Sequence, residues 1–377
     1  MSDNPFQPLA MPGVQKLRPY EPGKPPEALE RELGIASALK LASNENPLGP
    51  SPEALAAMAE VLPGVARYPD GNGFALKEAL AGHHDIDPAC ITLGNGSNDV
   101  LELVARAFLG PGRKAVMARH AFAVYWLATQ AAGAEPVITP PNPAQHPMMP
   151  LGHDLESMVS HVDGATRVVF IANPNNPTGT WLNGEELKGF IEALPENIVI
   201  VVDEAYVEYA SLRPGYLEAS RWLADHPNLV ITRTFSKAYG LAGLRVGYAL
   251  SSPGVADLLN RVRQPFNVNS VAQAAAVAAL RDQEHIRRSV EINDRGMEQL
   301  NTGLRGLGLG MLPSAGNFLC VHFGRPAAPV CAALERQGVI VRPLEPYGLG
   351  EFLRITIGME KENRRLLQAL GEAIQEA

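Results

Sequence analysis

The sequence predicts an α/β fold, in which a large domain with a mainly parallel sheet between helices is followed by a smaller α/β domain. Segments with the pattern of strands alternate with segments of helical spacing along most of the chain. Two of the strand segments, RVVFIAN (167–173) and IVIVVDE (198–204), are almost continuous runs of apolar residues. Such runs are typical of parallel strands buried on both faces of a sheet. A length of 377 residues also exceeds what one small core requires.

The elements of the large domain follow in order. A short strand with a glycine turn is expected at 91–96, and further strands at 114–118, 167–173, 198–204, 229–234 and 246–251. Helices are expected at 97–109, 123–134 and 185–194, and the proline-rich stretch 140–150 is expected to be a surface loop. Strands and helices that alternate in this way predict a doubly wound domain.

The two ends of the chain have a different pattern. Seven prolines among the first 30 residues predict an extended arm. A long helical region from 271 to about 305 is followed by a strand at 317–323, a helix and a strand within 330–343, a strand at 352–358 and a helix at 362–377. We therefore divide the chain into an arm (1–40), a large domain (41–275) and a small domain (276–377).

Composition excludes several classes of function. The formal net charge of −8 argues against nonspecific binding of nucleic acid. The three cysteines form no CxxC pair and are odd in number, so a disulfide framework is not expected and a reducing cytoplasm fits. No apolar run reaches the length of a membrane span, and the first residues lack the pattern of a signal peptide. Histidines and acidic residues show no metal-ligand spacing, so we expect no metal site.

Polar residues follow the predicted parallel strands at the edge where α/β sheets bind ligands. Asp203 and Glu204 end one strand and Asn173 ends another. Asp203 comes directly after five apolar residues, so it is expected to be partly buried and to need a cationic partner. The turn GNGSND (94–99) opens a helix, and free backbone N–H groups at such a helix start can bind phosphate.

Lys237 lies in the stretch TFSKAYGLAGLRVG (234–247), between hydroxyl residues and a run of small residues. Desolvation of an amine favours its neutral form, which is nucleophilic toward carbonyl groups. A lysine of this kind, an acidic residue for a pyridinium nitrogen and a phosphate cradle are what a protein supplies to pyridoxal phosphate. These residues therefore predict an enzyme that uses this cofactor.

With these residues in place, the sequence resembles the histidinol-phosphate aminotransferases, within the fold-type-I pyridoxal-phosphate aminotransferases. The motifs that carry the resemblance are PYEPGKP (19–25), KLASNENPLGPSP (40–52), RYPDGNG (67–73), NPNNPTG (173–179), VDEAYVEY (202–209), TFSKAYGLAGLRVG (234–247) and FLRITIG (352–358). The resemblance implies a seven-stranded, mainly parallel sheet in the large domain. It also implies that the arm packs on the small domain and on the partner in a homodimer.

The resemblance implies a role for each matching residue. Lys237 would form the Schiff base with the cofactor and move the proton, and Asp203 would pair with the ring nitrogen. Asn176 and Tyr206 would bind the ring oxygen, and Phe122 would stack on the ring. Residues that would hold the cofactor phosphate are Ser97, Asn98, Ser236, Arg245 and, from the partner subunit, Tyr68. Residues that would bind the substrate are Tyr20, Asn176, Arg342 and Arg354.

The implied reaction converts L-histidinol phosphate and 2-oxoglutarate to imidazole-acetol phosphate and L-glutamate, by ping-pong transfer, in histidine biosynthesis. One site must then bind both a phosphate and a carboxylate, and planar guanidinium groups match both anions. Three alternatives stay open: an aromatic amino-acid aminotransferase or an enzyme of dual specificity, a threonine-phosphate decarboxylase, and a pyridoxal-binding regulator. The last would carry a DNA-binding segment ahead of this fold, and the short arm has no helix-turn-helix pattern.

Overall fold

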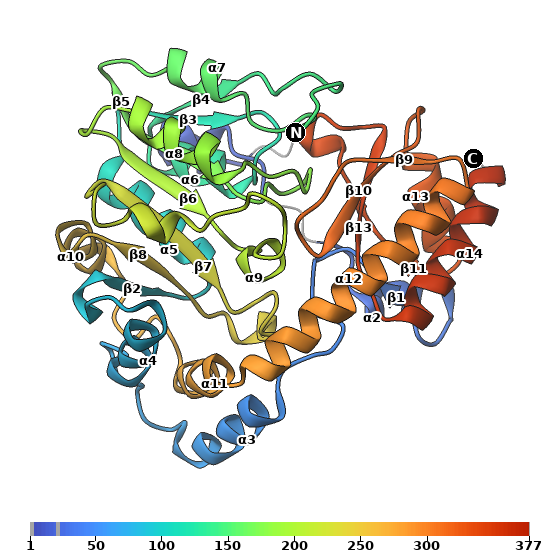
Figure 1. Ribbon diagram of the computed structural model, residues 1–377, viewed down its shortest axis with the longest axis horizontal. Helices are drawn as coiled ribbons and strands as arrows, with labels where there is room; N and C mark the ends of the chain where they lie inside the picture. The colour runs from blue at the N-terminus through green and yellow to red at the C-terminus, as the bar shows by residue number, and fades with distance from the viewer. Residues whose placement is uncertain (1–3, 20–22, 377) are drawn as a thin grey trace.

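A computed structural model describes residues 4–19 and 23–376 of the chain. The large domain contains a seven-stranded sheet of order β2-β8-β7-β6-β5-β3-β4 (Figure 1). The strands are β2 (Ile91–Gly94), β3 (Lys114–Ala118), β4 (Glu135–Thr139), β5 (Thr166–Ala172), β6 (Val199–Asp203), β7 (Leu229–Thr234) and β8 (Gly247–Ser251). Strand β8 is antiparallel to both of its neighbours, β2 and β7, and all other neighbouring pairs of this sheet are parallel. The predicted mainly parallel, seven-stranded sheet is therefore confirmed.

Helices cover both faces of this sheet, because alternate residues of its strands belong to two separate cores. Val169 and Ile171 of β5 pack in one core, and Val168 and Phe170 pack in the other. The first core is covered by α3 (Pro52–Val61), α4 (Phe74–His84), α8 (Gly184–Ala193) and α11 (Ser270–Arg281), and the second by α5 (Ser97–Phe108), α6 (Val124–Ala131) and α10 (Pro253–Val262). This double burial explains why the central strands β5 and β6 are apolar at almost every position.

The small domain has its own core. Its sheet has the order β12-β13-β10-β9, and three helices pack on it, as residues of all three share one apolar cluster with the strands. The elements are α12 (Gln283–Gly306), β9 (Gly310–Met311), β10 (Phe318–His322), α13 (Ala328–Arg336), β11 (Val339–Ile340), β12 (Arg342–Pro343), β13 (Phe352–Thr356) and α14 (Glu360–Glu376). Helix α12 runs from the large domain along the small one (Figure 1).

A segment from the beginning of the chain completes the small domain. Strand β1 (Leu39–Lys40) pairs in parallel with β11, and Leu39 and Leu41 lie in the small-domain core. The limits of the arm and the two domains remain a proposal, but this segment packs with the small domain on both sides of residue 40.

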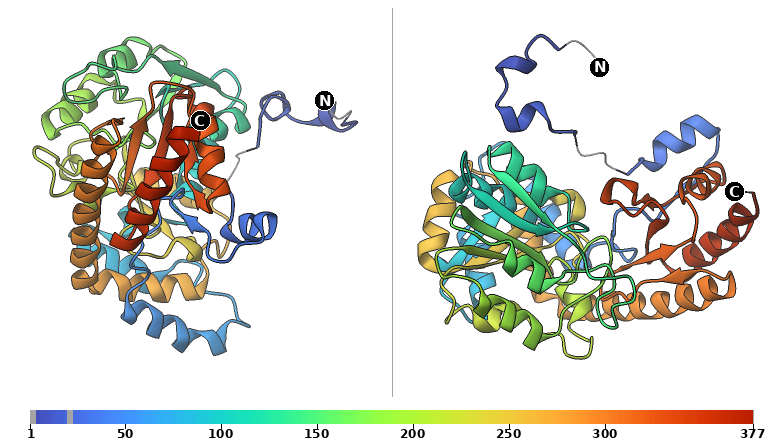
Figure 2. Two further views of the ribbon diagram at one scale, coloured as in Figure 1. Left: turned by 90° about the vertical axis from the view of Figure 1, so that its right-hand side faces the viewer. Right: turned by 90° about the horizontal axis from the view of Figure 1, so that it is seen from above.

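The predicted extended arm is wrong for residues 26–33, which form helix α2 (Pro26–Leu33). Pro26 stands at the start of α2, where its missing N–H costs no hydrogen bond, and Gly34 ends the helix with a φ of 66°. Residues 4–19 do extend away from the body of the molecule (Figure 2) and contain the short helix α1 (Pro12–Gln15), which packs against α6.

The long helical region predicted after residue 271 is two helices. Asp282 interrupts it between α11 and α12, and its carboxylate accepts a hydrogen bond from the backbone N–H of His285 at 3.1 Å. Asp282 is thus the N-cap of α12, a position that favours aspartate over continuation of a helix. The chain therefore changes direction where it passes to the small domain.

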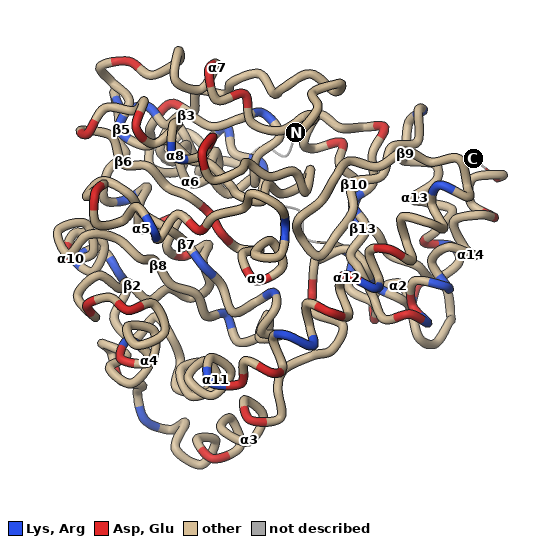
Figure 3. The backbone as a smooth tube through the Cα atoms, viewed as in Figure 1, with Lys and Arg blue, Asp and Glu red and all other residues tan. Residues whose placement is uncertain are grey.

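The remaining short helices are α7 (Leu155–Ser160) and α9 (Val207–Ala210). Acidic and basic residues are mixed over both domains (Figure 3), in keeping with a modest net charge. Within the described residues, no helix is both long and apolar enough to cross a membrane.

Candidate active site

Residues of both domains line one pocket at the carboxyl ends of the parallel strands. Predicted site residues that line it are Ser97, Asn98, Phe122, Asn176, Asp203, Tyr206, Ser236, Lys237, Arg245, Arg342 and Arg354. Its wall also contains residues that the sequence analysis did not select, among them Ala42, Ser43, Asn44, Tyr125 and Thr234. The structure thus brings together residues that lie more than 300 positions apart.

Lys237 lies in this pocket after the end of β7, and its amine donates a hydrogen bond to the backbone carbonyl of Ser43 at 3.1 Å. Desolvation, together with the positive charges of Arg354 and Arg245, lowers the pKa of Lys237 to about 7. A large part of this amine is therefore neutral at physiological pH. This agrees with the prediction of a nucleophilic lysine.

Asp203 ends β6 with its side chain buried, and two hydroxyl groups bind it. Tyr125 Oη donates to Asp203 Oδ2 at 2.8 Å, and Thr232 Oγ1 donates to Asp203 Oδ1 at 3.0 Å. Desolvation raises the pKa of Asp203, while both hydrogen bonds oppose the rise. A cation in the pocket would stabilise the charged carboxylate further.

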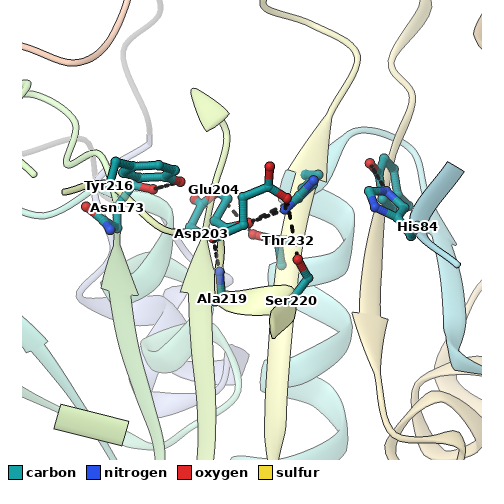
Figure 4. A network of polar contacts seen from close by, with 11 residues as sticks. His84, Asn173, Asp203, Glu204, Tyr216, Ala219, Ser220 and Thr232 are labelled. Atoms are coloured by element: carbon teal, nitrogen blue, oxygen red, sulfur yellow. Dashed lines mark hydrogen bonds and ion pairs between the residues drawn. The ribbon is translucent and has the colours of Figure 1, made fainter. Parts of the chain in front are cut away.

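A buried cation, Arg233, pairs with Glu204, the residue next to Asp203, while the cationic partner expected for Asp203 itself stays a prediction. Successive residues of a strand point to opposite faces, so Glu204 turns away from Asp203 (Figure 4). Its carboxylate contacts Arg233 at 2.6 Å and accepts the backbone N–H of Ala219 at 2.6 Å. Arg233 also contacts Glu218 at 2.8 Å. This buried network joins β6, β7 and the chain around Ala219 behind the pocket.

The N-terminus of α5 and the Arg245 side chain form an anion cradle. No side chain caps the first turn of α5, which begins at Ser97. The N–H of Asp99 donates to the Gly96 carbonyl at 3.2 Å, and the N–H groups of Ser97 and Asn98 could bind a ligand. Arg245 donates a hydrogen bond to Ser236 Oγ at 3.2 Å. Gly96, with a φ of 83°, lies so close that a Cβ there would be 2.3 Å from Arg245 Nη2. Only glycine therefore lets the guanidinium lie over this turn.

Two arginines of the small domain, Arg342 and Arg354, form another part of the wall, and both are buried. Arg354 Nη1 donates to Asn176 Oδ1 at 2.6 Å, and Arg354 Nη2 donates to the carbonyl of Ala42 at 2.6 Å. The Arg354 guanidinium also lies 5.4 Å from the ring centroid of Phe318. Arg354 thus ties the small domain to the loop after β5.

Asn44 is a buried residue of the site that the sequence analysis did not select. It is 1% exposed, and its Nδ2 donates to Tyr206 Oη at 2.8 Å. A φ of 56° is a left-handed conformation that asparagine tolerates better than most residues. The motif NENP (44–47) marks this asparagine in the sequence, but the motif does not show which distant side chain Asn44 contacts.

Aromatic residues of α6 and its N-terminal turn line a further part of the pocket. Phe122 and Tyr125 meet edge to face with ring centroids 5.9 Å apart. Tyr125 is fully buried, and its hydroxyl reaches Asp203, so it belongs to the site as well.

Among the described residues, one predicted site residue, Tyr68, does not line this pocket. Tyr68 is 83% exposed and stacks on Phe266 with ring centroids 4.8 Å apart. This exposure is compatible with the predicted contact to a partner subunit and does not test it. Tyr20 lies outside the described residues. In the described part of the chain, no three His, Cys, Asp or Glu side chains gather as a metal site would require.

The fold and this pocket define a fold-type-I transferase. The chain matches the family "Aminotransferase class I and II" over residues 36–370 and belongs to it. The predicted family of enzymes is therefore confirmed.

Within this family, the chain is similar to several proteins named histidinol-phosphate aminotransferase. A protein of Pseudomonas fluorescens, histidinol-phosphate aminotransferase 2, is 57% identical over 378 residues, which cover 99% of each chain. A protein of Methylococcus capsulatus with the same name is 55% identical and covers 97% of this chain and 98% of its own. The crystal structure of histidinol-phosphate aminotransferase from Sinorhizobium meliloti in complex with pyridoxal-5'-phosphate is 33% identical, with a TM-score of 0.88 over 97% of both chains.

Proposed function

We propose that this chain is a pyridoxal-phosphate-dependent aminotransferase that converts L-histidinol phosphate and 2-oxoglutarate to imidazole-acetol phosphate and L-glutamate. The observation that carries the proposal is one pocket that combines Lys237, Asp203 and two separate sets of anion-binding groups. One set, around Arg245, suits the cofactor phosphate. The other, Arg342 and Arg354, suits the phosphate or carboxylate of a substrate. The names of the full-length relatives support this choice of substrate.

The residues present fit the cofactor. The uncapped start of α5, with Ser97 and Asn98, would hold its phosphate together with Ser236 and Arg245. The space at Gly96 that a Cβ would fill leaves room for Arg245 beside this phosphate. Bound pyridoxal phosphate supplies an electron sink that stabilises negative charge on the substrate carbon that loses its proton.

Side chains around the pocket would orient the cofactor ring. Asp203, buried and held by Tyr125 and Thr232, would pair with the ring nitrogen and keep it protonated. Asn176 and Tyr206 would donate hydrogen bonds to the ring oxygen, and Phe122 would pack against the ring face.

Lys237 would attach the cofactor and move the proton of the reaction. Its lowered pKa leaves a large part of the amine neutral near pH 7, so it can attack a carbonyl group and then accept a proton from the substrate carbon. The same amine would return this proton to the other carbon in each half-reaction, in a ping-pong sequence.

The substrate anion would lie against the small domain. Arg354 is already held by Asn176 and the Ala42 carbonyl, so its guanidinium is fixed before a ligand arrives. Arg342 would add a second guanidinium for the phosphate. Tyr20, on the arm, remains a proposed third contact.

We also propose a cytoplasmic homodimer in which Tyr68 reaches the cofactor phosphate of the partner subunit. Exposed apolar side chains occur near Tyr68 in the sequence, at Leu55, Leu62, Val65 and Phe74, and the half-exposed ring of Phe266 stacks on Tyr68. Exposed apolar side chains that gather on one surface are typical of a site that binds another chain. Free cysteines fit a reducing compartment.

A single-turnover experiment tests the proposal. The purified protein, loaded with pyridoxal phosphate, is mixed with L-histidinol phosphate, phenylalanine or threonine phosphate, and the absorbance of the bound cofactor is followed. Released carbon dioxide is assayed in parallel. We expect rapid amination of the cofactor with histidinol phosphate, and no reaction in Lys237→Ala, which lacks the amine.

Three other outcomes would contradict the proposed substrate, the proposed reaction or the role of Lys237. Equal rates with phenylalanine would replace the proposal by an enzyme of dual specificity. Carbon dioxide released from threonine phosphate would overturn the transaminase reaction. Full turnover by Lys237→Ala would exclude Lys237 as the reacting amine.

A further inference from the structure

Asn44 connects the two domains through a chain of buried hydrogen bonds. The backbone N–H of Asn44 donates to Thr356 Oγ1 at 2.9 Å, and Thr356 Oγ1 lies 3.2 Å from Asn44 Oδ1. On its other side the Asn44 amide reaches Tyr206 Oη at 2.8 Å. Thr356 stands on β13 of the small domain, and Tyr206 follows β6 of the large domain. All three residues are 3% exposed or less.

The direction of each hydrogen bond in this chain is fixed. The Thr356 oxygen accepts the backbone N–H of Asn44, and among the described residues the Thr356 hydroxyl proton has one acceptor, Asn44 Oδ1. A flipped amide would leave a buried hydroxyl without an acceptor, which is costly. The Asn44 NH₂ group therefore faces Tyr206, and the Tyr206 oxygen accepts from it.

A phenol that accepts a hydrogen bond still has its own proton to donate. Burial raises the pKa of Tyr206 to about 12, so the phenol keeps this proton at physiological pH. The Asn44 NH₂ group cannot accept it. Since Tyr206 lines the pocket, the proton is directed there.

We propose that Thr356 and Asn44 are positioning residues that make Tyr206 a hydrogen-bond donor to the ring oxygen of the cofactor. The inference rests on the proposed function and deepens it, because it assigns the small domain a part in the electronic state of the cofactor. Strand β13, which contributes Arg354 to the substrate end of the pocket, contributes Thr356 to the Tyr206 hydrogen bond two residues later.

The test measures the pH at which the absorbance of the bound cofactor changes, as the nitrogen that links it to Lys237 gains a proton. A donor to the ring oxygen competes with this nitrogen for electron density and lowers the midpoint. In Tyr206→Phe we expect the midpoint to rise by about one to two pH units, because a hydrogen bond to a charged acceptor is lost.

Thr356→Val keeps the shape of the side chain and removes the group that fixes the Asn44 amide. The amide can then turn, so that its oxygen accepts the Tyr206 proton. We expect the midpoint to rise by about 0.5 to 1 pH unit, as for the loss of one neutral hydrogen bond. Thr356→Ser retains the hydroxyl and should keep the parental midpoint. If the valine variant does not fold, Thr356→Ala removes the hydroxyl instead, and Thr356→Ser remains the control that retains it.

The double variant Tyr206→Phe/Thr356→Val separates this mechanism from a general loss of structure. If Thr356 acts through Tyr206, the double variant has the midpoint of Tyr206→Phe alone. Additive shifts, or a parental midpoint in both Thr356→Val and Thr356→Ala, would overturn the relay. A parental midpoint in Tyr206→Phe would overturn the Tyr206 assignment on which the relay depends. The amination test with Lys237→Ala is independent of all these results.

Discussion

Arg342 and Arg354 are directly opposed residues of the antiparallel pair β12 and β13, and both line the pocket. Directly opposed residues of such a pair have Cβ atoms about 4.5–5.5 Å apart, and like charges at this distance repel. An anion bound near both side chains would be attracted by each of them and would offset this repulsion.

The variant Arg342→Ala should therefore weaken the binding of a substrate with a doubly charged phosphate most. We expect KM for histidinol phosphate to rise about 10- to 100-fold, the value of one charge-assisted hydrogen bond. Arg336→Ala, on the exposed side of α13, is the matched control and should change nothing. Unaltered turnover of histidinol phosphate by Arg342→Ala would remove this arginine from the site.

The amine of Lys237 should react with an aldehyde at a much lower pH than an ordinary lysine does. Its pKa is lowered to about 7, so the neutral, reactive form is lost as the pH falls through 7 and dominates above it. The rate at which the cofactor-free protein takes up pyridoxal phosphate should rise with pH along a titration curve whose midpoint lies near pH 7, and it should level off at higher pH.

Arg354→Met is a useful comparison in the same experiment. Removal of its positive charge should move the midpoint of uptake to higher pH, because Arg354 is the strongest charge that lowers the Lys237 pKa. A midpoint near 10 in the parental protein would contradict the desolvated environment described for this lysine.

The ion pair of Arg233 with Glu204 should matter for stability. Its side chains are 6% and 0% exposed, so Arg233→Met would leave a buried carboxylate without its cationic partner. We expect the free energy of unfolding in urea to fall by about 3 to 5 kcal/mol. Arg336→Met, which breaks a pair with side chains 61% and 54% exposed, should cost less than about 1 kcal/mol. Equal losses in the two variants would show that burial does not set the strength of these pairs.

Complementation between subunits tests the predicted role of Tyr68. Tyr68→Ala should bind pyridoxal phosphate about 10-fold more weakly, as one hydrogen bond to a charged group is lost. At a pyridoxal phosphate concentration that leaves Tyr68→Ala largely unloaded, a mixture of Lys237→Ala and Tyr68→Ala subunits should be more active than either variant alone, because one site of each mixed dimer then has both side chains. No recovery in proven mixed dimers would mean that Tyr68 does not serve the partner.

The parts of the fold that could be predicted are those with a strong local signal. Strands β5 and β6 are apolar at almost every position, because both faces of the sheet are covered. Strand β4 was missed, since its sequence EPVIT contains a glutamate and a proline and its position at the sheet edge leaves Ile138 42% exposed. Helix α2 was missed because its prolines were interpreted as a sign of extended chain.

The sequence predicted those site residues whose chemical role follows from their own type and their neighbours in the chain. Lys237 and Asp203 could be selected from their surroundings in the sequence. The two hydroxyl groups that bind Asp203 could not be selected, because burial calls for compensating groups without stating which distant side chains supply them. Asn44 and Tyr206 are 162 positions apart, and only the folded chain brings them together.

The pairing of β1 with β11 has a consequence for synthesis of the protein. Residues 39–41 leave the ribosome early, but the strands that bury them are made about 300 residues later. The large domain can form its sheet during translation, whereas the small domain must wait for its last strands. Until then the Ser43 carbonyl and Lys237 have no completed wall around them, so a nascent chain cannot hold a functional site.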